Sequence, residues 1–123
     1  MSGTVNKVIL IGNLGDDVKV HYFKEDNAIG RFPLATSEIY YNREKNEQTS
    51  HTEWHNIVVR NHLAEVCEKH LKKGDKIYIE GKLRTRKWNH NGHIRYMTEI
   101  HTDHLDFLIL KKEKNDILTT PQK

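Results

Sequence analysis

Hydrophobic and polar residues alternate along most of the chain, which is the pattern of half-buried β-strands. Short clusters of Gly, Asn, Asp and Ser separate the alternating segments and mark turns between them. The pattern predicts extended segments at residues 5–14, 18–23, 28–41, 54–59, 76–88 and 93–110. Residues 42–52 are polar throughout, so we predict a flexible loop there.

One segment has a helical period instead. Its apolar stripe, with spacings of three and four residues, consists of Leu63, Val66, Cys67 and Leu71. This spacing predicts a single helix with one buried face. Asn61 is the predicted N-cap, and Gly74, which follows two lysines, is the predicted left-handed C-terminal cap.

The order of these elements predicts the fold. The helix lies between the third and fourth main strands, and Asn89-His90-Asn91-Gly92 is a hairpin signal between the last two strands. Long strands in so small a sheet need closure, because closure removes exposed edges. We therefore predict an all-β, five-stranded Greek-key barrel of the oligonucleotide/oligosaccharide-binding (OB) type, with an extended hairpin formed by its last two strands.

Length and composition agree with one small soluble domain. The 123 residues, 36% of them hydrophobic, suit a domain at residues 1–110 and a short tail at 111–123. A single cysteine excludes an internal disulfide framework. The longest apolar runs have four residues, and the start shows no targeting pattern, so we expect no membrane segment and a cytoplasmic, nucleoid-associated protein. The net charge of +3 permits a nucleic-acid partner without demonstrating one.

Residues 76–88 give the clearest functional signal. Alternation predicts that one face points into the barrel, the face formed by Ile77, Ile79, Gly81 and Leu83. The opposite face carries Arg84, Arg86 and Trp88, and residues 82–87 hold four cations and no acid. Arginine binds phosphate and stacks on bases, and tryptophan offers a flat stacking surface. A lone tryptophan is more often buried packing, but this combination on one outward face favours nucleic-acid binding.

A second aromatic residue shares a face with an arginine. Trp54 and Arg60 alternate onto the same outward face of the strand at 54–59. Tyr40, near the end of the long strand, is a third candidate platform, although an edge-strand packing role fits its pattern equally well. The predicted helix is not basic, which argues against a duplex reader, whereas exposed aromatics among cations suit single strands.

The sequence contains little that indicates a catalytic or metal site. Nine histidines are present, but His101 and His104 are three residues apart on one strand and point to opposite faces. No second cysteine joins them, so we predict no metal site and no cofactor. Gly12-Asn13-Leu14-Gly15 lacks the lysine of a phosphate loop and predicts a barrel turn. No nucleophile motif is present, and we predict that the protein is not an enzyme.

Several blocks of this sequence resemble the bacterial-type single-stranded DNA-binding proteins. The most specific are Val-Asn-Lys-Val-Ile-Leu-Ile-Gly-Asn-Leu-Gly at 5–15 and Ile-Glu-Gly-Lys-Leu-Arg-Thr-Arg-Lys-Trp at 79–88. Shorter blocks lie at 34–38, 52–55, 63–74 and 95–99, and the resemblance runs from about residue 5 to residue 108. It implies an OB-fold homotetramer that binds single-stranded DNA in replication, recombination and repair.

The resemblance also implies roles for single residues. It implies base stacking by Trp54 and Trp88, with Tyr40 and Arg60 at positions where relatives commonly carry Trp and Phe. The residues that it implies as backbone contacts are Lys7, Lys73, Arg84, Arg86 and Lys87, and His21 and His62 stand where relatives carry basic residues. His55 matches a subunit-interface position, and Tyr78 is our further candidate for subunit contact.

The tail departs from that family. Many members end in an acidic tip that recruits other proteins, and residues 111–123 contain none, so we expect no recruitment through this tail. Two alternatives remain open at this stage. One is an accessory OB module for replication restart or RNA binding, and the other is an oligomeric interaction scaffold.

Overall fold

The structure is a computed structural model, and it describes residues 3–24 and 27–111. The predicted tail therefore lies, beyond residue 111, outside the described residues. Within the described part, six strands and one helix follow in the order β1 (Val8–Leu14), β2 (Lys19–Tyr22), β3 (Ala28–Asn42), β4 (Glu47–Arg60), α1 (Asn61–His70), β5 (Lys76–His90) and β6 (His93–Ile109).

Five of these strands close into a barrel, as predicted. The strand order is β1-β5-β6-β4-β3, and β1 pairs with β3 to complete the circle. That closing contact is short, with Asn13 opposite Ala35 and Leu14 opposite Leu34. The β4–β6 contact is parallel, and β2 adds to the edge of β3 outside the closed circle. The all-β, five-stranded OB barrel is thus confirmed.

The core fills the barrel and the space under α1. The fully buried aliphatic side chains at its centre are Leu34, Ile57, Val59, Ile77 and Ile79. Helix α1 packs against β2, β3 and β4 through its buried side chains Ala64 and Cys67. Burial raises the pKa of the Cys67 thiol to about 12, so this cysteine is a packing residue rather than a nucleophile.

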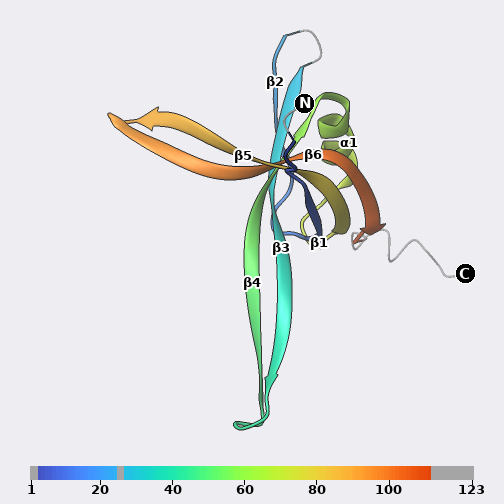
Figure 1. Cartoon of the computed structure of the whole chain (residues 1–123). Helices are drawn as coiled ribbons and strands as arrows, with labels where there is room; N and C mark the ends of the chain where they lie inside the picture. Colours follow the sequence, from blue (N-terminus) through green and yellow to red (C-terminus); the bar gives the residue numbers. More distant parts are fainter. Residues whose placement is uncertain (1–2, 25–26, 112–123) are drawn as a thin grey trace, which may run out of the picture.

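Two long hairpins project from the barrel in different directions (Figure 1). Strands β3 and β4 form one arm, paired from Ile29 and Arg60 out to Asn42 and Glu47. Strands β5 and β6 form the other, which ends at the predicted hairpin turn between His90 and His93. The predicted loop at 42–52 is wrong, because β4 begins at Glu47. The Thr and Ser residues there fit a ribbon that is open to solvent on both faces, which an apolar pattern cannot reveal.

Both predicted helix caps are also wrong. Arg60 occupies the N-cap position, without a side-chain cap, while Asn61 Oδ1 accepts a hydrogen bond from the Ala28 N–H at 3.0 Å. The helix ends at an extended Leu71. Gly74, with φ of +97°, lies in the following turn, and its N–H donates to the Leu14 carbonyl at 2.8 Å. Tertiary contacts with β1 and β3 therefore use the residues that local capping rules would assign to the helix.

The predicted inward face of β5 is correct only as far as Gly81. Ile77 and Ile79 are fully buried, but Leu83 is 50% exposed. A Cβ at Gly81 would lie 2.2 Å from the His101 carbonyl oxygen, so β5 and β6 cross closely at this glycine. The register also shifts between Glu80 and Gly81. Beyond this point the strand leaves the barrel and enters the arm, which has no interior.

Candidate nucleic-acid interface

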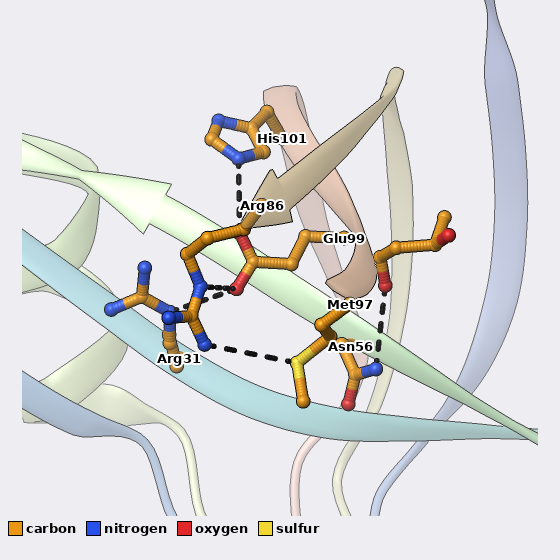
Figure 2. Close-up of polar contacts among 7 residues, drawn as sticks. Arg31, Asn56, Arg86, Met97, Glu99 and His101 are labelled. Atoms are coloured by element: carbon orange, nitrogen blue, oxygen red, sulfur yellow. Dashed lines mark hydrogen bonds and ion pairs between the residues drawn. The ribbon is translucent and has the colours of Figure 1, made fainter. Parts of the chain in front are cut away.

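The base of the β5–β6 arm lies against the outward face of β3 and β4. A hollow of about 510 Å³ separates them. Its walls include Arg31 and Pro33 from β3, Asn56 from β4, and Met97 and Glu99 from β6. Asn56 also donates a hydrogen bond to the Thr98 carbonyl at 3.3 Å, which ties β4 to β6 (Figure 2). We call this the central hollow.

Two smaller hollows continue from it. One, of about 390 Å³, shares Asn56 and Met97 with the central hollow and contains Trp54. The other, of about 210 Å³, shares Arg31 and Glu99 and is lined by Arg31, Arg60, Arg84, Thr85, Arg86, Glu99 and His101. We call these the tryptophan hollow and the arginine hollow. Because each shares lining residues with the central hollow, the three hollows adjoin one another across the strands, and we call them together the track.

Trp54 occupies one end of this track. Its side chain is 60% exposed, as predicted for an outward residue. The edge of its ring rests on Gly15, where an added Cβ would lie 2.3 Å from Cζ3 of the ring. The glycine therefore leaves room for the tryptophan, and any larger residue forces the ring to move.

Trp88 lies on the β5–β6 arm, next to the arginine hollow. The Arg86 guanidinium sits over its ring, with 4.5 Å between Cζ and the ring centroid. Across the strand pair, Arg95 lies opposite Trp88, and the two line a further hollow of about 340 Å³ with His90. A cation on one side of the indole polarises the ring and limits its rotation. This arrangement confirms that Arg86 and Trp88 share a face.

Glu99 is the buried centre of the arginine hollow. Its side chain is 1% exposed, and its Oε2 accepts hydrogen bonds from Arg31 Nε at 3.1 Å and from Arg86 Nε at 3.0 Å (Figure 2). His101 Nε2 lies 3.3 Å from the other oxygen, Oε1. Burial opposes ionisation, but the hydrogen bonds from Arg86 and Arg31 outweigh it and lower the pKa of Glu99. The group is a carboxylate at neutral pH.

His101 stays neutral near pH 7. Burial lowers its pKa, and the charges of Arg60 and Arg84 act in the same direction against the contact with Glu99. The arginine hollow thus takes its positive charge from arginines. Such guanidinium groups bind phosphate through paired N–H donors.

The predicted lysines lie apart from this track. Lys7 precedes β1 and forms an ion pair with Glu80 at 3.2 Å. Lys73 follows α1, and its backbone N–H donates to Asp17 at 2.8 Å. Lys87 is exposed on the β5–β6 arm, where alternation puts it on the face opposite Trp88. Of the predicted backbone contacts, the structure brings only Arg84 and Arg86 into the arginine hollow.

Tyr40 lies far out on the β3–β4 arm. It is 52% exposed, and its hydroxyl donates to the Glu38 carboxylate. In the strand register, Trp54 is opposite Ala35 and Tyr40 is opposite Thr49. Alternation therefore places Tyr40 on the other face from Trp54, and Tyr41 on the same face. A stacking role for Tyr40 remains a prediction.

Of the predicted interface residues, His55 lines the tryptophan hollow, whereas Tyr78 lies on the outer barrel wall. His55 Nε2 is 2.9 Å from Thr36 Oγ1, and Tyr78 donates to Glu80 at 2.6 Å. Tyr78 lies beside Ile11 of β1, which is 52% exposed. An apolar patch of this kind on the outer barrel wall suits contact with another protein surface.

His21 and His62, which stand where relatives carry basic residues, lie on different elements. His21 lines the central hollow and packs edge-on against Phe23, with 4.5 Å between ring centroids. His62 is exposed in the first turn of α1. Only His21 therefore lies beside the track.

Three residues that shape the track, Arg31, Glu99 and Gly15, were not predicted from the sequence. Arg31 is the one cation among the apolar residues at the start of β3, Glu99 is one of three acids in β6, and Gly15 matches an ordinary turn glycine. A finer use of alternation would have put Arg31 on the Trp54 face. Nothing local in the sequence pairs Glu99 with Arg31, since 68 residues separate them.

Within residues 3–24 and 27–111, no three His, Cys, Asp or Glu side chains gather in a way that could hold a metal ion. No helix of that part is long and apolar enough to cross a membrane.

Comparison with known proteins gives consistent matches. The chain is 50% identical over 107 residues to a single-stranded DNA-binding protein of Bacteroides thetaiotaomicron, covering 85% of this chain and 66% of that protein's length. The structure resembles that of the Plasmodium falciparum SSB complex with ssDNA, with a TM-score of 0.73 and 34% identity over 90% of this chain and 99% of the other.

A Thermus aquaticus single-stranded DNA-binding protein, solved as a deletion mutant, matches with a TM-score of 0.70 and 25% identity over 91% of this chain and 52% of the other. A family-wide comparison matches residues 5–108 to the single-strand binding protein family. That match covers both arms, the barrel and every residue of the track. The chain belongs to the single-strand binding protein family.

Proposed function

We propose that this protein binds single-stranded DNA, with little regard to sequence, along the track formed by the tryptophan, central and arginine hollows. One observation carries the proposal. Three adjoining hollows, with four arginines among their lining residues, lie between an exposed tryptophan at one end and a tryptophan covered by an arginine beyond the other end. The similar Plasmodium falciparum protein was solved in complex with ssDNA.

Stacking supplies the base contacts. Trp54 offers an exposed ring held at its edge by Gly15, and Trp88 offers a ring whose orientation Arg86 limits. Unpaired bases stack on such rings, and each stacked base contributes about 1–3 kcal/mol. Every base has such a face, so this contact is sequence-tolerant.

Arginines supply the backbone contacts. Arg60 and Arg84 line the arginine hollow together with Arg31 and Arg86. Neutralising phosphates releases condensed counterions, so affinity falls as salt rises, with a slope that counts the phosphates engaged. We place Lys7, Lys73 and Lys87 outside this track, as contacts of a strand that continues over the rest of the molecule.

The biological role follows from sequence-tolerant binding. Coating exposed strands prevents re-pairing and nuclease attack during replication, recombination and repair, and it requires no catalysis. We propose a homotetramer in which the outer wall of β1 and β5, with Ile11 and Tyr78, contacts a second copy. The cytoplasm, at the nucleoid, is the corresponding location.

Intrinsic tryptophan fluorescence tests the proposal directly, because the chain has only two tryptophans. Poly(dT) should quench the emission, while a matched duplex should leave it nearly unchanged. The double variant Trp54→Ala and Trp88→Ala should lose several kcal/mol of affinity, measured with a labelled oligonucleotide, and keep the wild-type circular dichroism. Unchanged affinity in that variant would contradict stacking, and tighter binding of poly(U) than of poly(dT) would favour an RNA-binding module.

A further inference from the structure

The least expected group of the track is an acid. Glu99 is almost fully buried beneath a surface that is proposed to meet a polyanion. By charge alone a carboxylate here weakens DNA binding, because it offsets one positive charge near the phosphates. A buried carboxylate at this place therefore needs a different physical reason.

The hydrogen-bond geometry supplies that reason. One oxygen of Glu99, Oε2, accepts from the Nε atoms of both Arg31 and Arg86, which come from strands β3 and β5. The carboxylate therefore fixes both guanidinium groups by the same atom. Each arginine keeps its two terminal nitrogens for other partners, and the Arg86 Nη2 also contacts the Met97 sulfur at 3.9 Å (Figure 2).

The position of Arg86 connects this acid to the stacking surface. The guanidinium that Glu99 holds is the one that lies over Trp88, 4.5 Å from the ring centroid. Without Glu99, the long arginine side chain regains several rotamers, and the ring loses a fixed neighbour. Arg31, which is 43% exposed in its side chain, is tied from β3 in the same way.

We propose that Glu99 is a positioning residue for single-strand binding: it fixes Arg31 and Arg86 in the orientation that receives phosphate and holds Trp88 ready for a base. This inference rests on the proposed function of the track. It adds that a buried negative charge increases affinity for DNA, because the orientation it imposes outweighs the repulsion it adds.

The test replaces Glu99 by Gln, which keeps the shape and removes the charge. Positioning predicts about tenfold weaker binding of a labelled oligo(dT), even though the net charge of the protein rises by one. It also predicts a shallower dependence of affinity on salt, because fewer phosphates are engaged. A charge effect alone predicts the reverse for both quantities. Equal or tighter binding by Glu99→Gln overturns the proposal.

Glu65→Gln is the matched control. It makes the same change in net charge on the exposed surface of α1. This control should bind like the wild type or slightly more tightly. If the wild type itself does not bind oligo(dT), the proposed function fails, whereas normal wild-type binding with an unaffected Glu99→Gln variant removes only the positioning role.

A second variant decides the matter if Glu99→Gln does not fold. Arg86→Lys keeps the charge and loses the planar group that spans Glu99 and Trp88. Positioning predicts weaker binding and a red-shifted Trp88 emission in the Trp54→Phe background. Wild-type affinity in Arg86→Lys contradicts the proposal.

Discussion

The two arms have the same architecture and opposite charge. On the β5–β6 arm, residues 82–97 contain five Lys or Arg residues and no acid, whereas on the β3–β4 arm residues 36–53 contain four acids and two cations. Both arms carry exposed aromatic residues. Aromatic content alone therefore does not define a DNA-binding ribbon, because the phosphates of a strand favour only one of the two surfaces.

The arms also differ in how side-chain hydrogen bonds hold them to neighbouring strands. The base of the β5–β6 arm is tied to its neighbours by Glu99, by Asn56 and by Asn6, whose side chain bonds both backbone groups of Leu83 at 2.9 Å. The outer β3–β4 arm is a two-stranded ribbon exposed from about Glu38 to Trp54. We expect the supported arm to provide pre-organised contacts and the other to adapt on binding.

The largest effect is expected from removing the stacking site on the β5–β6 arm. The pair Arg86→Ala and Trp88→Ala should cost about 2–4 kcal/mol of binding free energy, because a stacked base and a phosphate contact are lost together. The corresponding pair Tyr40→Ala and Tyr41→Ala should cost less than half as much. Fluorescence anisotropy of a labelled oligo(dT) measures both, and equal losses would erase the distinction between the arms.

An intermediate effect is expected at Gly15. A side chain there must displace the Trp54 ring, since even a Cβ would lie 2.3 Å from it. Gly15→Val should therefore weaken binding by about 1–2 kcal/mol, close to the effect of losing one stacked base. Titration calorimetry with oligo(dT) checks this value. In the Trp54→Ala background the same change should have almost no effect on binding, and an additive loss would contradict the contact.

The pH dependence of stability tests the support of the β5–β6 arm. Because the folded state lowers the pKa of Glu99 from 4.5, its ionisation stabilises the protein above pH 4.5. That contribution is lost as the pH falls below 4.5 and through the lower pKa of the folded state. Urea unfolding between pH 3 and pH 6 should show a smaller loss of stability in Glu99→Gln than in the wild type. Parallel curves would argue against an ionised, hydrogen-bonded Glu99.

The smallest effect concerns the acids of the β3–β4 arm. Glu38→Gln with Glu47→Gln should increase affinity by a few tenths of a kcal/mol at low salt, because exposed charges act weakly and are screened. The increase should disappear at 0.5 M salt. Anisotropy titrations at two salt concentrations measure it, and a decrease in affinity would show that these acids hold the arm in a binding conformation.

Much of the barrel was predictable because alternation is a local pattern. The inward positions Ile77 and Ile79, the single helix and the Asn-Gly hairpin all follow from short-range pattern. The extent of β4 did not, since a polar ribbon such as residues 47–53 has no buried face to record in the sequence. Leu83 looked inward because alternation continues after the barrel has ended at Gly81.

The site was predictable in part for the same reason. Alternation put Arg84, Arg86 and Trp88 on one face, and the structure places them beside the arginine hollow. It could not reveal that Glu99 lies between Arg31 and Arg86, because that contact depends on how the β5–β6 arm crosses β3 and β4. Nor could it show that Gly15 and Trp54 touch, since that contact depends on closure between β1 and β3.

The most direct test of single-strand binding along the track follows the arginine Nε–H and tryptophan Nε1–H signals in ¹⁵N-correlated NMR spectra while oligo(dT) is added. Binding along the track predicts large shifts for Trp54, Trp88, Arg31 and Arg86, and small shifts for backbone amides near Ile11 and Tyr78. Shifts concentrated at Ile11 and Tyr78, with the two tryptophans and two arginines unmoved, would contradict a single-strand binding track along these hollows.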